Sequence, residues 1–392
     1  MIRVMLLLLT ASAASSTVAP AGFIGLGIMG DGMAKCMLKA GRPLHVWSRD
    51  KAVCERFAAS AAKEEGYASV VIEESPAAVV AAVERTYLML PTPDACEQVY
   101  SMDGGVLEGL AKGKQLVDCA TLRPGDMRSL ADRVKAKGGK FVEAPVSGSK
   151  APAASGSLIF MAAGDRATFD AASDDLAAMG KRSVFVSESV GTATKMKLVV
   201  NMIMGAQLAA LAEGVALAEG IGLSASDLQD VLDDGAMASP LVSLKGPLMS
   251  RSAFDAAFPL KYALKDMRFA LELDEASGLN LGVSGAATSA YAEAADNLNL
   301  GESDFSAVVD VSRKPKPVVN DLWDGEVDEM AYFDEDGDSL SDDQPDWRDV
   351  RKLKALFELE ATGISDPFKE SDSETPKGGD EADEDLDPPL AR

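Results

Sequence analysis

Short apolar runs alternate with stretches of helical periodicity between residues 21 and 190, and this pattern restricts the fold more than any other feature. The first five runs are FIGLG, PLHVWS, RTYLMLP, QLVDCA and KFVEAPVSG, and two more, LIFMAAG and RSVFVS, follow within residues 158–187. Such alternation is typical of βαβ units, whose strands pair in parallel and are covered by helices. We therefore predict an α/β domain with a doubly wound parallel sheet, which the last two runs extend.

The pattern changes at Gly191 and becomes helical. Residues 192–221 are rich in Ala, Leu, Met and Val and carry little charge. Their length and composition predict a long helix buried at the centre of a second domain. Further helical patterns are found at 224–235, 262–276, 284–298 and 304–312. The sequence thus predicts an all-α-helical domain over residues 191–312.

Most of the negative charge lies in a C-terminal tail. The chain has a net charge of −24, and residues 321–392 hold 25 Asp and Glu against seven Lys and Arg. We expect residues 313–392 to be mostly disordered, with one candidate helix at 347–361. Nucleic-acid binding depends on Lys and Arg that neutralise phosphates, so this charge balance disfavours a nucleic-acid partner.

The N-terminal segment 1–20, MIRVMLLLLTASAASSTVAP, combines one arginine, a short apolar run and a stretch of small residues. This composition is typical of a cleavable targeting signal and is too short for a membrane span. A leader without a targeting role has the same composition. A targeting signal would direct the protein to a plastid, a mitochondrion or the secretory route. Without a targeting role of this segment, the protein would be cytoplasmic.

The four cysteines, Cys36, Cys54, Cys96 and Cys119, form no CxxC pair. Spacing of this kind indicates free thiols in a core rather than a disulfide framework or a zinc site. We predict no metal site.

A glycine-rich hexapeptide follows the first strand-like run and precedes a helical pattern. It consists of Gly25, Leu26, Gly27, Ile28, Met29 and Gly30. In this context GxGxxG indicates dinucleotide binding: Gly25 permits the tight turn, Gly27 lets the backbone approach the pyrophosphate, and Gly30 lets helix and strand pack closely. The helix N-terminus then faces the phosphates.

The end of the second strand-like run distinguishes NADP from NAD. NAD sites favour an acidic residue that accepts hydrogen bonds from the ribose, whereas NADP sites avoid that carboxylate and supply an arginine for the 2′-phosphate. Ser48 and Arg49 occupy these positions, with Asp50 next to them. The pair favours NADPH. A solvated surface pair is the simpler alternative.

The sequence contains a single histidine, His45, inside the second strand-like run. Many nicotinamide-dependent dehydrogenases use a histidine as proton donor. The position of His45 within a strand-like run instead indicates a residue that packs in the domain or lies at the rim of the cofactor site. Lysine is the remaining side chain that combines a cation near a carbonyl oxygen with acidity near neutral pH, if its pKa is lowered by burial or a neighbouring cation. A catalytic lysine is therefore expected.

Five stretches together resemble the β-hydroxyacid dehydrogenase family, and within it the glyoxylate/succinic semialdehyde reductases. They are GFIGLGIMGDGMAKCMLKAG, VWSRD, EAPVSGSKAPA, GTATKMKLVVN and FPLKYALKDMRFAL, and the resemblance covers residues 21–312. It implies a Rossmann domain at 21–190, followed by the all-helical domain, with the active site in the cleft between them. It also implies that Lys197 is catalytic and that Asn201 helps to hold the substrate. Lys195 is expected to be a solvated charge.

Further residues match the family one by one. Ser147 matches the substrate-binding serine, and with the amides of Gly148 and Ser149 it offers a cradle for a carboxylate. Thr121 matches a residue that meets both cofactor and substrate, and Lys265 matches a cofactor-contacting lysine. The stretch that closes the site includes Phe258 and Asp266.

Two positions depart from the family pattern. Ala193 stands where a glycine is usual, and Ala120 stands where serine is common. Neither change removes a reactive side chain, but the first affects the start of the helix that carries Lys197. Substrate preference is therefore less well determined than reaction type.

The resemblance implies an NADPH-dependent reductase of small carboxylated aldehydes, with a lysine as proton donor, no membrane partner and a homo-oligomeric state. Glyoxylate and succinic semialdehyde are the first candidate substrates. One alternative is an oxidising 3-hydroxyisobutyrate-type dehydrogenase. The other is a catalytically silent chromatin scaffold with a dehydrogenase-like domain, against which the presence of Lys197 speaks.

Overall fold

A computed structural model of the protein describes residues 18–314, apart from the side chains of residues 274 and 276. These residues belong to one compact unit. The predicted targeting segment lies almost wholly outside the described residues. So do the predicted tail beyond residue 314 and the candidate helix at 347–361.

The first part of the chain forms one mixed sheet. Its strands are β1 (Ala21–Ile24), β2 (Leu44–Trp47), β3 (Val70–Ile72), β4 (Arg85–Leu88), β5 (Gln115–Asp118), β6 (Lys140–Glu143), β7 (Val146–Ser147), β8 (Leu158–Gly164) and β9 (Gly180–Ser187). The order is β3-β2-β1-β4-β5-β6-β8-β7, and β9 pairs with β8. Strands β1 to β6 are parallel, as predicted.

The last two apolar runs extend the sheet, as predicted, but in the opposite direction. Strand β8 pairs antiparallel with β6 and with β7, and β9 pairs parallel with β8. The run KFVEAPVSG, expected as one strand, is divided into β6 and β7. Antiparallel neighbours need no long crossover connection, so this reversal fits within residues 144–157, which contain β7 and α7.

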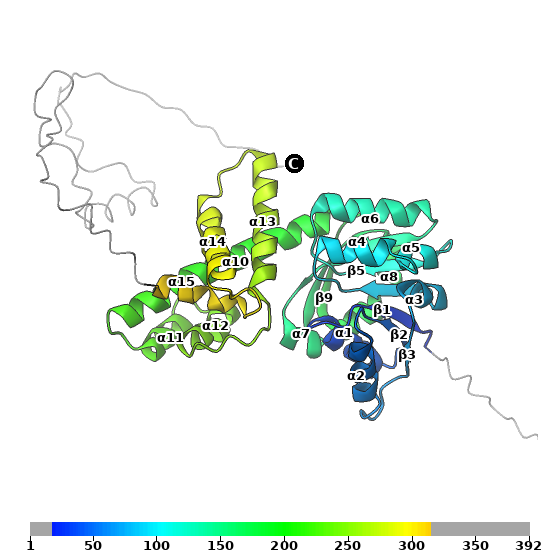
Figure 1. Ribbon diagram of the computed structural model, residues 1–392, viewed down its shortest axis with the longest axis horizontal. Helices are drawn as coiled ribbons and strands as arrows, with labels where there is room; N and C mark the ends of the chain where they lie inside the picture. Colours follow the sequence, from blue (N-terminus) through cyan, green and yellow to red (C-terminus); the bar gives the residue numbers. More distant parts are fainter. Residues whose placement is uncertain (1–17, 315–392) are drawn as a thin grey trace, which may run out of the picture. The chain divides into compact units, whose positions relative to one another are not determined.

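Helices cover both faces of the sheet. They are α1 (Gly30–Lys39), α2 (Lys51–Ala61), α3 (Pro76–Ala82), α4 (Pro93–Ser101), α5 (Val106–Gly109), α6 (Pro124–Ala136), α7 (Lys150–Ala154), α8 (Arg166–Ala171) and α9 (Ser173–Met179). One core cluster joins the sheet to α1, α2, α7 and α9, and a second joins it to α3, α4, α5 and α6. Figure 1 shows α4, α5 and α6 on one side of the sheet and α1, α2 and α7 on the other.

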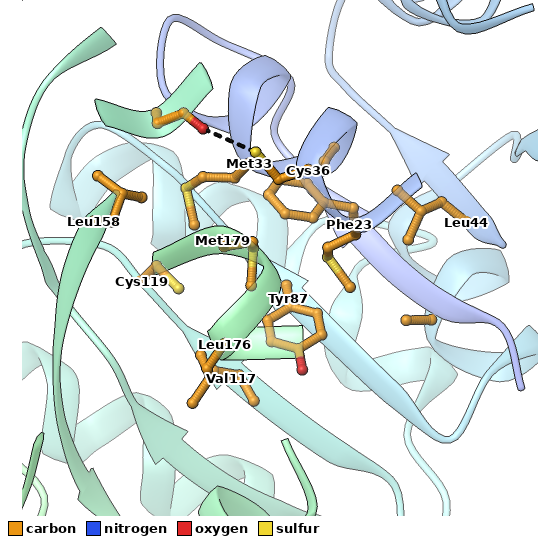
Figure 2. Packing of buried hydrophobic residues seen from close by; sticks show 14 of the residues in the cluster. Phe23, Met33, Cys36, Leu44, Tyr87, Val117, Cys119, Leu158, Leu176 and Met179 are labelled. Carbon is orange, nitrogen blue, oxygen red and sulfur yellow. Dashed lines mark hydrogen bonds between the residues drawn. The ribbon is translucent and has the colours of Figure 1, made fainter. Parts of the chain in front are cut away.

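The first of these clusters shows how the glycine-rich segment is anchored. Phe23 of β1 stacks on Tyr87 of β4 with ring centroids 6.4 Å apart. Figure 2 shows both rings among Met33 of α1 and Met179 of α9. All four side chains are fully buried. Dense packing of this kind fixes β1 and α1, and therefore the turn between them.

From residue 192 the described chain is helical. The elements are α10 (Thr192–Gly220), α11 (Ala225–Asp234), α12 (Pro240–Ser250), α13 (Leu260–Ser277), α14 (Gly282–Ala292), the π-helical turn η1 (Glu293–Asn297), the 3₁₀ turn η2 (Phe305–Val308) and α15 (Val309–Arg313). Helix α10 packs against α12, α13, α14 and α15. Its residues Leu208, Ala212 and Val215 are buried in the core of these helices.

Two elements were not predicted from the sequence. Strand β3 has only three residues, none fully buried, so its apolar signal is weak. Helix α12 contains Pro247 in its interior. Proline removes a helical hydrogen bond and is unfavourable there, which conceals the helical pattern. Both elements depend on tertiary neighbours.

All four cysteines are free and buried, as predicted. The Cys36 thiol donates to the backbone oxygen of Ala153 at 3.4 Å (Figure 2). Burial raises the pKa of each of the four thiols. These groups are therefore protonated packing residues.

Candidate active site

A cavity of about 390 Å³ opens at the carboxyl end of the parallel strands. One wall is formed by the turn after β1, the end of β2 and the segments after β4 and β5. The other is formed by residues 257–259 and the first turns of α13. The predicted residues that line it are Gly25, Gly27, Ile28, Met29, Gly30, Ser48, Arg49, Thr121, Phe258, Lys265 and Asp266. The structure thus brings together most of the residues predicted from separate motifs.

The glycine-rich turn has the geometry that a bound dinucleotide requires. Gly25 has φ of +98°, in the region that favours glycine. A Cβ atom on Gly30 would meet the backbone oxygen of Gly25 at 1.9 Å, so helix and turn are in direct contact. A Cβ on Gly27 would meet nothing within 4 Å, so its backbone faces open space in the cavity wall. These residues fit a pyrophosphate at the start of α1.

Ser48 and Arg49 follow β2 directly and line the same cavity. The neighbouring carboxylate of Asp50 is the N-cap of α2 and accepts a hydrogen bond from the amide of Ala52 at 2.9 Å. A capping carboxylate is committed to its own helix. Ser48 and the exposed Arg49 are left as the groups that face the cavity at this point.

The loop after β5 is linked to α13 by Lys265. The ammonium of Lys265 donates a hydrogen bond to the backbone oxygen of Thr121. It also lies 2.9 Å from Oδ1 of Asp266, an oxygen that accepts no hydrogen bond, so this contact is an ion pair. Nearby, Arg123 donates two hydrogen bonds to Glu272 of α13. The two sides of the cavity are therefore joined by polar contacts.

Lys197 and Asn201 lie one turn apart on α10 and form a buried chain with Asp266. The Lys197 ammonium donates to Oδ1 of Asn201 at 2.7 Å, and Nδ2 of Asn201 donates to Oδ2 of Asp266 at 2.6 Å. The exposed fractions of the three residues are 6%, 4% and 2%. Asp266 lines the cavity and is thus the direct link between the cavity and the lysine.

Burial sets the acidity of Lys197. Desolvation lowers its pKa to about 8, Asp266 acts in the opposite direction, and the nearby Lys265 cation lowers it further. A buried ammonium with this pKa gives up its proton far more readily than an exposed lysine. It is suited to proton transfer near neutral pH.

Glu143, which the sequence did not indicate as a site residue, holds the start of α10. Its carboxylate is fully buried at the end of β6 and accepts hydrogen bonds from the amides of Gly191 (2.6 Å), Ala193 (2.9 Å) and Thr194 (3.3 Å). The Thr194 hydroxyl donates to it as well, at 2.6 Å. The N-cap of α10 is Gly191, which has no side chain to fill this role. Ala193, which departs from the family pattern, is fully buried here and donates through its backbone.

Several residues considered in the sequence lie outside the cavity lining. Lys197 and Asn201 are among them and reach it only through Asp266. Ser147 is half-buried in β7 and Gly148 is exposed with φ of +130°. Leu26 is buried in the core below the turn. Lys195 is exposed on α10, as predicted, and Nδ1 of His45 lies 2.6 Å from Glu73.

The sequence reasoning did not identify several residues that line the cavity. They are Trp47, Met89, Leu90, Pro91, Ala95, Gln98, Val99, Ala257, Pro259 and Tyr262. Most follow β4, the neighbour of β1 in the sheet. Ligands of open α/β sheets bind outside the carboxyl ends of the strands, so the position of MLPTP after a strand-like run was an available signal.

Comparison with known proteins assigns the chain to a family. Residues 20–191 match the NAD binding domain of 6-phosphogluconate dehydrogenase, and residues 191–312 match a family described as NAD-binding of NADP-dependent 3-hydroxyisobutyrate dehydrogenase. Glyoxylate/succinic semialdehyde reductase 1 of Arabidopsis thaliana is 43% identical over 289 residues, which are 74% of this chain and 96% of that protein. The chain belongs to the β-hydroxyacid dehydrogenase family. It is an oxidoreductase with a nicotinamide-dinucleotide-binding domain.

Other members of the β-hydroxyacid dehydrogenase family and related proteins show the range of similarity. Glyoxylate/succinic semialdehyde reductase 2, chloroplastic, of Arabidopsis thaliana is 39% identical over 75% of this chain and 80% of that protein. The cytokine-like nuclear factor N-PAC of Homo sapiens is 36% identical over 73% of this chain, but only half of N-PAC is covered. The 3-hydroxyisobutyrate dehydrogenase of Salmonella typhimurium shares the fold, with a TM-score of 0.68 at 23% identity over 75% of this chain and 99% of that one.

Proposed function

We propose that this β-hydroxyacid dehydrogenase reduces small carboxylated aldehydes with NADPH, converting glyoxylate to glycolate and succinic semialdehyde to 4-hydroxybutyrate. The observation that carries the proposal is the buried chain from Lys197 through Asn201 to Asp266 at the wall of the cavity that also contains the glycine-rich turn. The names of the two Arabidopsis relatives support the substrate class.

Lys197 is the proposed proton donor. A bound nicotinamide cofactor supplies the hydride for the carbonyl carbon. Lys197 donates its proton to the carbonyl oxygen, and its positive charge stabilises the negative charge that develops there. Its lowered pKa, caused mainly by burial, makes the transfer favourable near neutral pH.

Asn201 and Asp266 orient the lysine in this proposal. Because Asn201 donates through Nδ2 to Asp266, its Oδ1 is presented to the Lys197 ammonium. Thr121 and Phe258 line the cavity and are the proposed substrate contacts. Ser147 and Gly148 remain the proposed carboxylate-binding residues. They lie outside the cavity lining, so a carboxylate bound by them would lie beyond that lining.

The preference for NADPH rests on the residues after β2. Ser48 and Arg49 line the cavity, and the carboxylate of the next residue, Asp50, caps α2. A serine hydroxyl and an arginine guanidinium can donate hydrogen bonds to a 2′-phosphate, and the arginine charge attracts it. A free carboxylate at this place would repel the phosphate. Lys265 is the proposed cofactor-contacting cation.

A substrate panel tests the proposed function. NADPH oxidation is followed by absorbance with glyoxylate, succinic semialdehyde and uncharged aldehydes of equal length. NADP⁺ reduction is followed in the same way with 3-hydroxyisobutyrate. We expect turnover of the carboxylated aldehydes and little turnover of the uncharged ones. If none of these aldehydes is reduced although NADPH binds, the proposal is wrong.

Two alternatives have support of their own. The description of the family matched by residues 191–312 favours a 3-hydroxyisobutyrate-type dehydrogenase, which would oxidise 3-hydroxyisobutyrate in the same panel. The similarity to N-PAC favours a catalytically silent scaffold, which would show no turnover at all. The buried Lys197 network supports an active enzyme over the scaffold.

We also propose that the protein forms a homo-oligomer through α10. The apolar residues Met196, Val199, Ile203 and Leu217 are between 45% and 63% exposed along this helix. An apolar helix face in water is typical of an interface. By length and composition α10 is apolar enough to cross a membrane, but its packing against four helices supports the core of a folded domain. Ile203→Glu should lower the mass measured by light scattering.

The name of the chloroplastic Arabidopsis relative supports a plastid destination for residues 1–20. We propose that this segment directs import. Its fusion to a fluorescent protein is expected to enter isolated plastids and to be shortened there. Retention of the full-length fusion outside the organelle would contradict this destination.

A further inference from the structure

Behind the cavity wall formed by residues 257–259 lies a buried ion pair that no motif indicated. Lys245 of α12 is 3% exposed, and Asp304, directly before η2, is fully buried. The Lys245 ammonium donates to Oδ1 of Asp304 at 2.7 Å. Neither residue lines the cavity.

The second oxygen of Asp304 holds the cavity wall itself. Oδ2 accepts hydrogen bonds from the consecutive amides of Ala257 and Phe258, each at 3.2 Å. Both of these residues line the cavity. The Asp304 carboxylate therefore fixes the backbone of the wall on one side, while Oδ1 is held by Lys245 and by the amide and hydroxyl of Ser306.

Other contacts connect the same elements to the Phe258 ring. The amide of Phe305 donates to the backbone oxygen of Phe258 at 3.0 Å, and the amide of Asp304 donates to that of Phe254 at 2.9 Å. The rings of Phe258 and Phe305 meet edge to face with centroids 5.3 Å apart. The Lys245 ammonium lies 4.9 Å from the centroid of the Phe305 ring. Lys245 thus contacts both the carboxylate and the ring that hold Phe258.

Charge explains why the pair is sensitive to substitution. Burial alone would raise the pKa of Asp304, but the hydrogen bonds from Lys245 and Ser306 outweigh it and hold the pKa below its usual value. The carboxylate is therefore ionised and accepts from five donors. An amide in its place has one oxygen and cannot accept from both Lys245 and the amides of Ala257 and Phe258.

We propose that Asp304 and Lys245 form a positioning pair that places Phe258 against the carbonyl substrate and thereby sets the KM for that substrate. The pair contacts neither substrate nor cofactor. This inference rests on the proposed aldehyde reduction. The inference extends that proposal because it assigns an effect on substrate KM to two residues outside the cavity lining.

The test compares Asp304→Asn and Lys245→Met with the matched control Asp175→Asn. Asp175 is also a buried carboxylate, 3% exposed and bonded to Arg42, Arg85 and Tyr87, but none of these residues lines the cavity. For each variant the measurements are the NADPH dissociation constant by fluorescence, kcat and KM for glyoxylate, and the denaturant midpoint.

We expect the Asp304 and Lys245 variants to raise KM for glyoxylate about tenfold, the effect of losing one well-packed aromatic contact. The NADPH dissociation constant should change less than twofold. The control should lose stability but keep its KM. Wild-type KM in a folded Asp304→Asn or Lys245→Met protein would overturn the proposal. So would failure of both variants to fold at 10 °C while Asp175→Asn folds, because the role would then be structural.

A double-mutant cycle tests the route through Phe258. If Asp304 acts by placing this ring, Asp304→Asn should raise KM in the wild-type background but not in a Phe258→Ala background. Additive effects on KM would overturn the route. A wild-type enzyme that reduces no aldehyde would remove the proposed function and this inference together. A wild-type enzyme that reduces glyoxylate, with a variant of unchanged KM, would remove the inference alone.

Discussion

Glu143 and Thr194 are joined by two hydrogen bonds, one from the Thr194 amide at 3.3 Å and one from its hydroxyl at 2.6 Å. The first residue ends a sheet strand and the second lies in the first turn of the helix that carries Lys197. A carboxylate at a helix N-terminus satisfies unpaired amides and interacts favourably with the helix dipole. This cap, supplied from a distant strand, fixes the lysine helix to the nucleotide-binding sheet.

Glu143→Gln should therefore destabilise the protein by about 2 kcal/mol and lower kcat, because buried amides at the start of α10 lose their acceptor. Denaturant unfolding and steady-state kinetics check both effects. Thr194→Val removes only the hydroxyl bond and serves as a graded control, with a loss of about 1 kcal/mol. Equal stability of wild type and Glu143→Gln would mean that the cap contributes nothing.

Lys197→Met keeps a flexible chain of similar volume but removes the ammonium and its proton. We expect kcat for glyoxylate to fall by about 10²-fold or more. NADPH affinity should persist, because the glycine-rich turn and Arg49 are unchanged. Lys195→Met is the matched control, since Lys195 is exposed on the same helix. Near-normal single-turnover reduction by Lys197→Met would contradict the proposed mechanism.

The pH dependence of kcat follows from the pKa of Lys197. A proton donor must be protonated, so kcat should be constant below its pKa of about 8 and decline above it. Asp266 raises this pKa, and Asp266→Asn should therefore move the decline to lower pH. Lys265 lowers it, so Lys265→Met should move the decline to higher pH. Identical profiles for wild type and both variants would show that another group limits kcat.

Ser48→Asp places a carboxylate near the proposed site of the 2′-phosphate. Repulsion between like charges at a partly exposed site is of the order of 1–3 kcal/mol, so NADPH should bind more weakly. NADH lacks the phosphate and should be affected less. Fluorescence titration with the two cofactors measures the ratio. An unchanged ratio of affinities would remove Ser48 from the phosphate site.

The sequence determined those parts of the protein that depend on residues close together in the chain. The glycine-rich turn is one, because Gly25 and Gly30 are required by backbone conformation and close contact within six residues. The long apolar helix beginning at Thr192 is another, since composition alone indicates it. Through its resemblance to a family, the sequence also indicated Lys197, Asn201 and Asp266 individually.

The tertiary structure decided how these local parts meet. Local propensity does not specify three of these features. They are the antiparallel pairing of β8 with β6, the continuation of helix α12 through Pro247, and the hydrogen bonds between Glu143 and Thr194. The same holds for the bond from Asn201 to Asp266 and for the ion pair of Lys245 with Asp304. A buried polar group must find a partner wherever the fold provides one. The partners in these three hydrogen-bonded pairs are 51 to 65 residues apart in the chain, and only the packing of their elements brings them together.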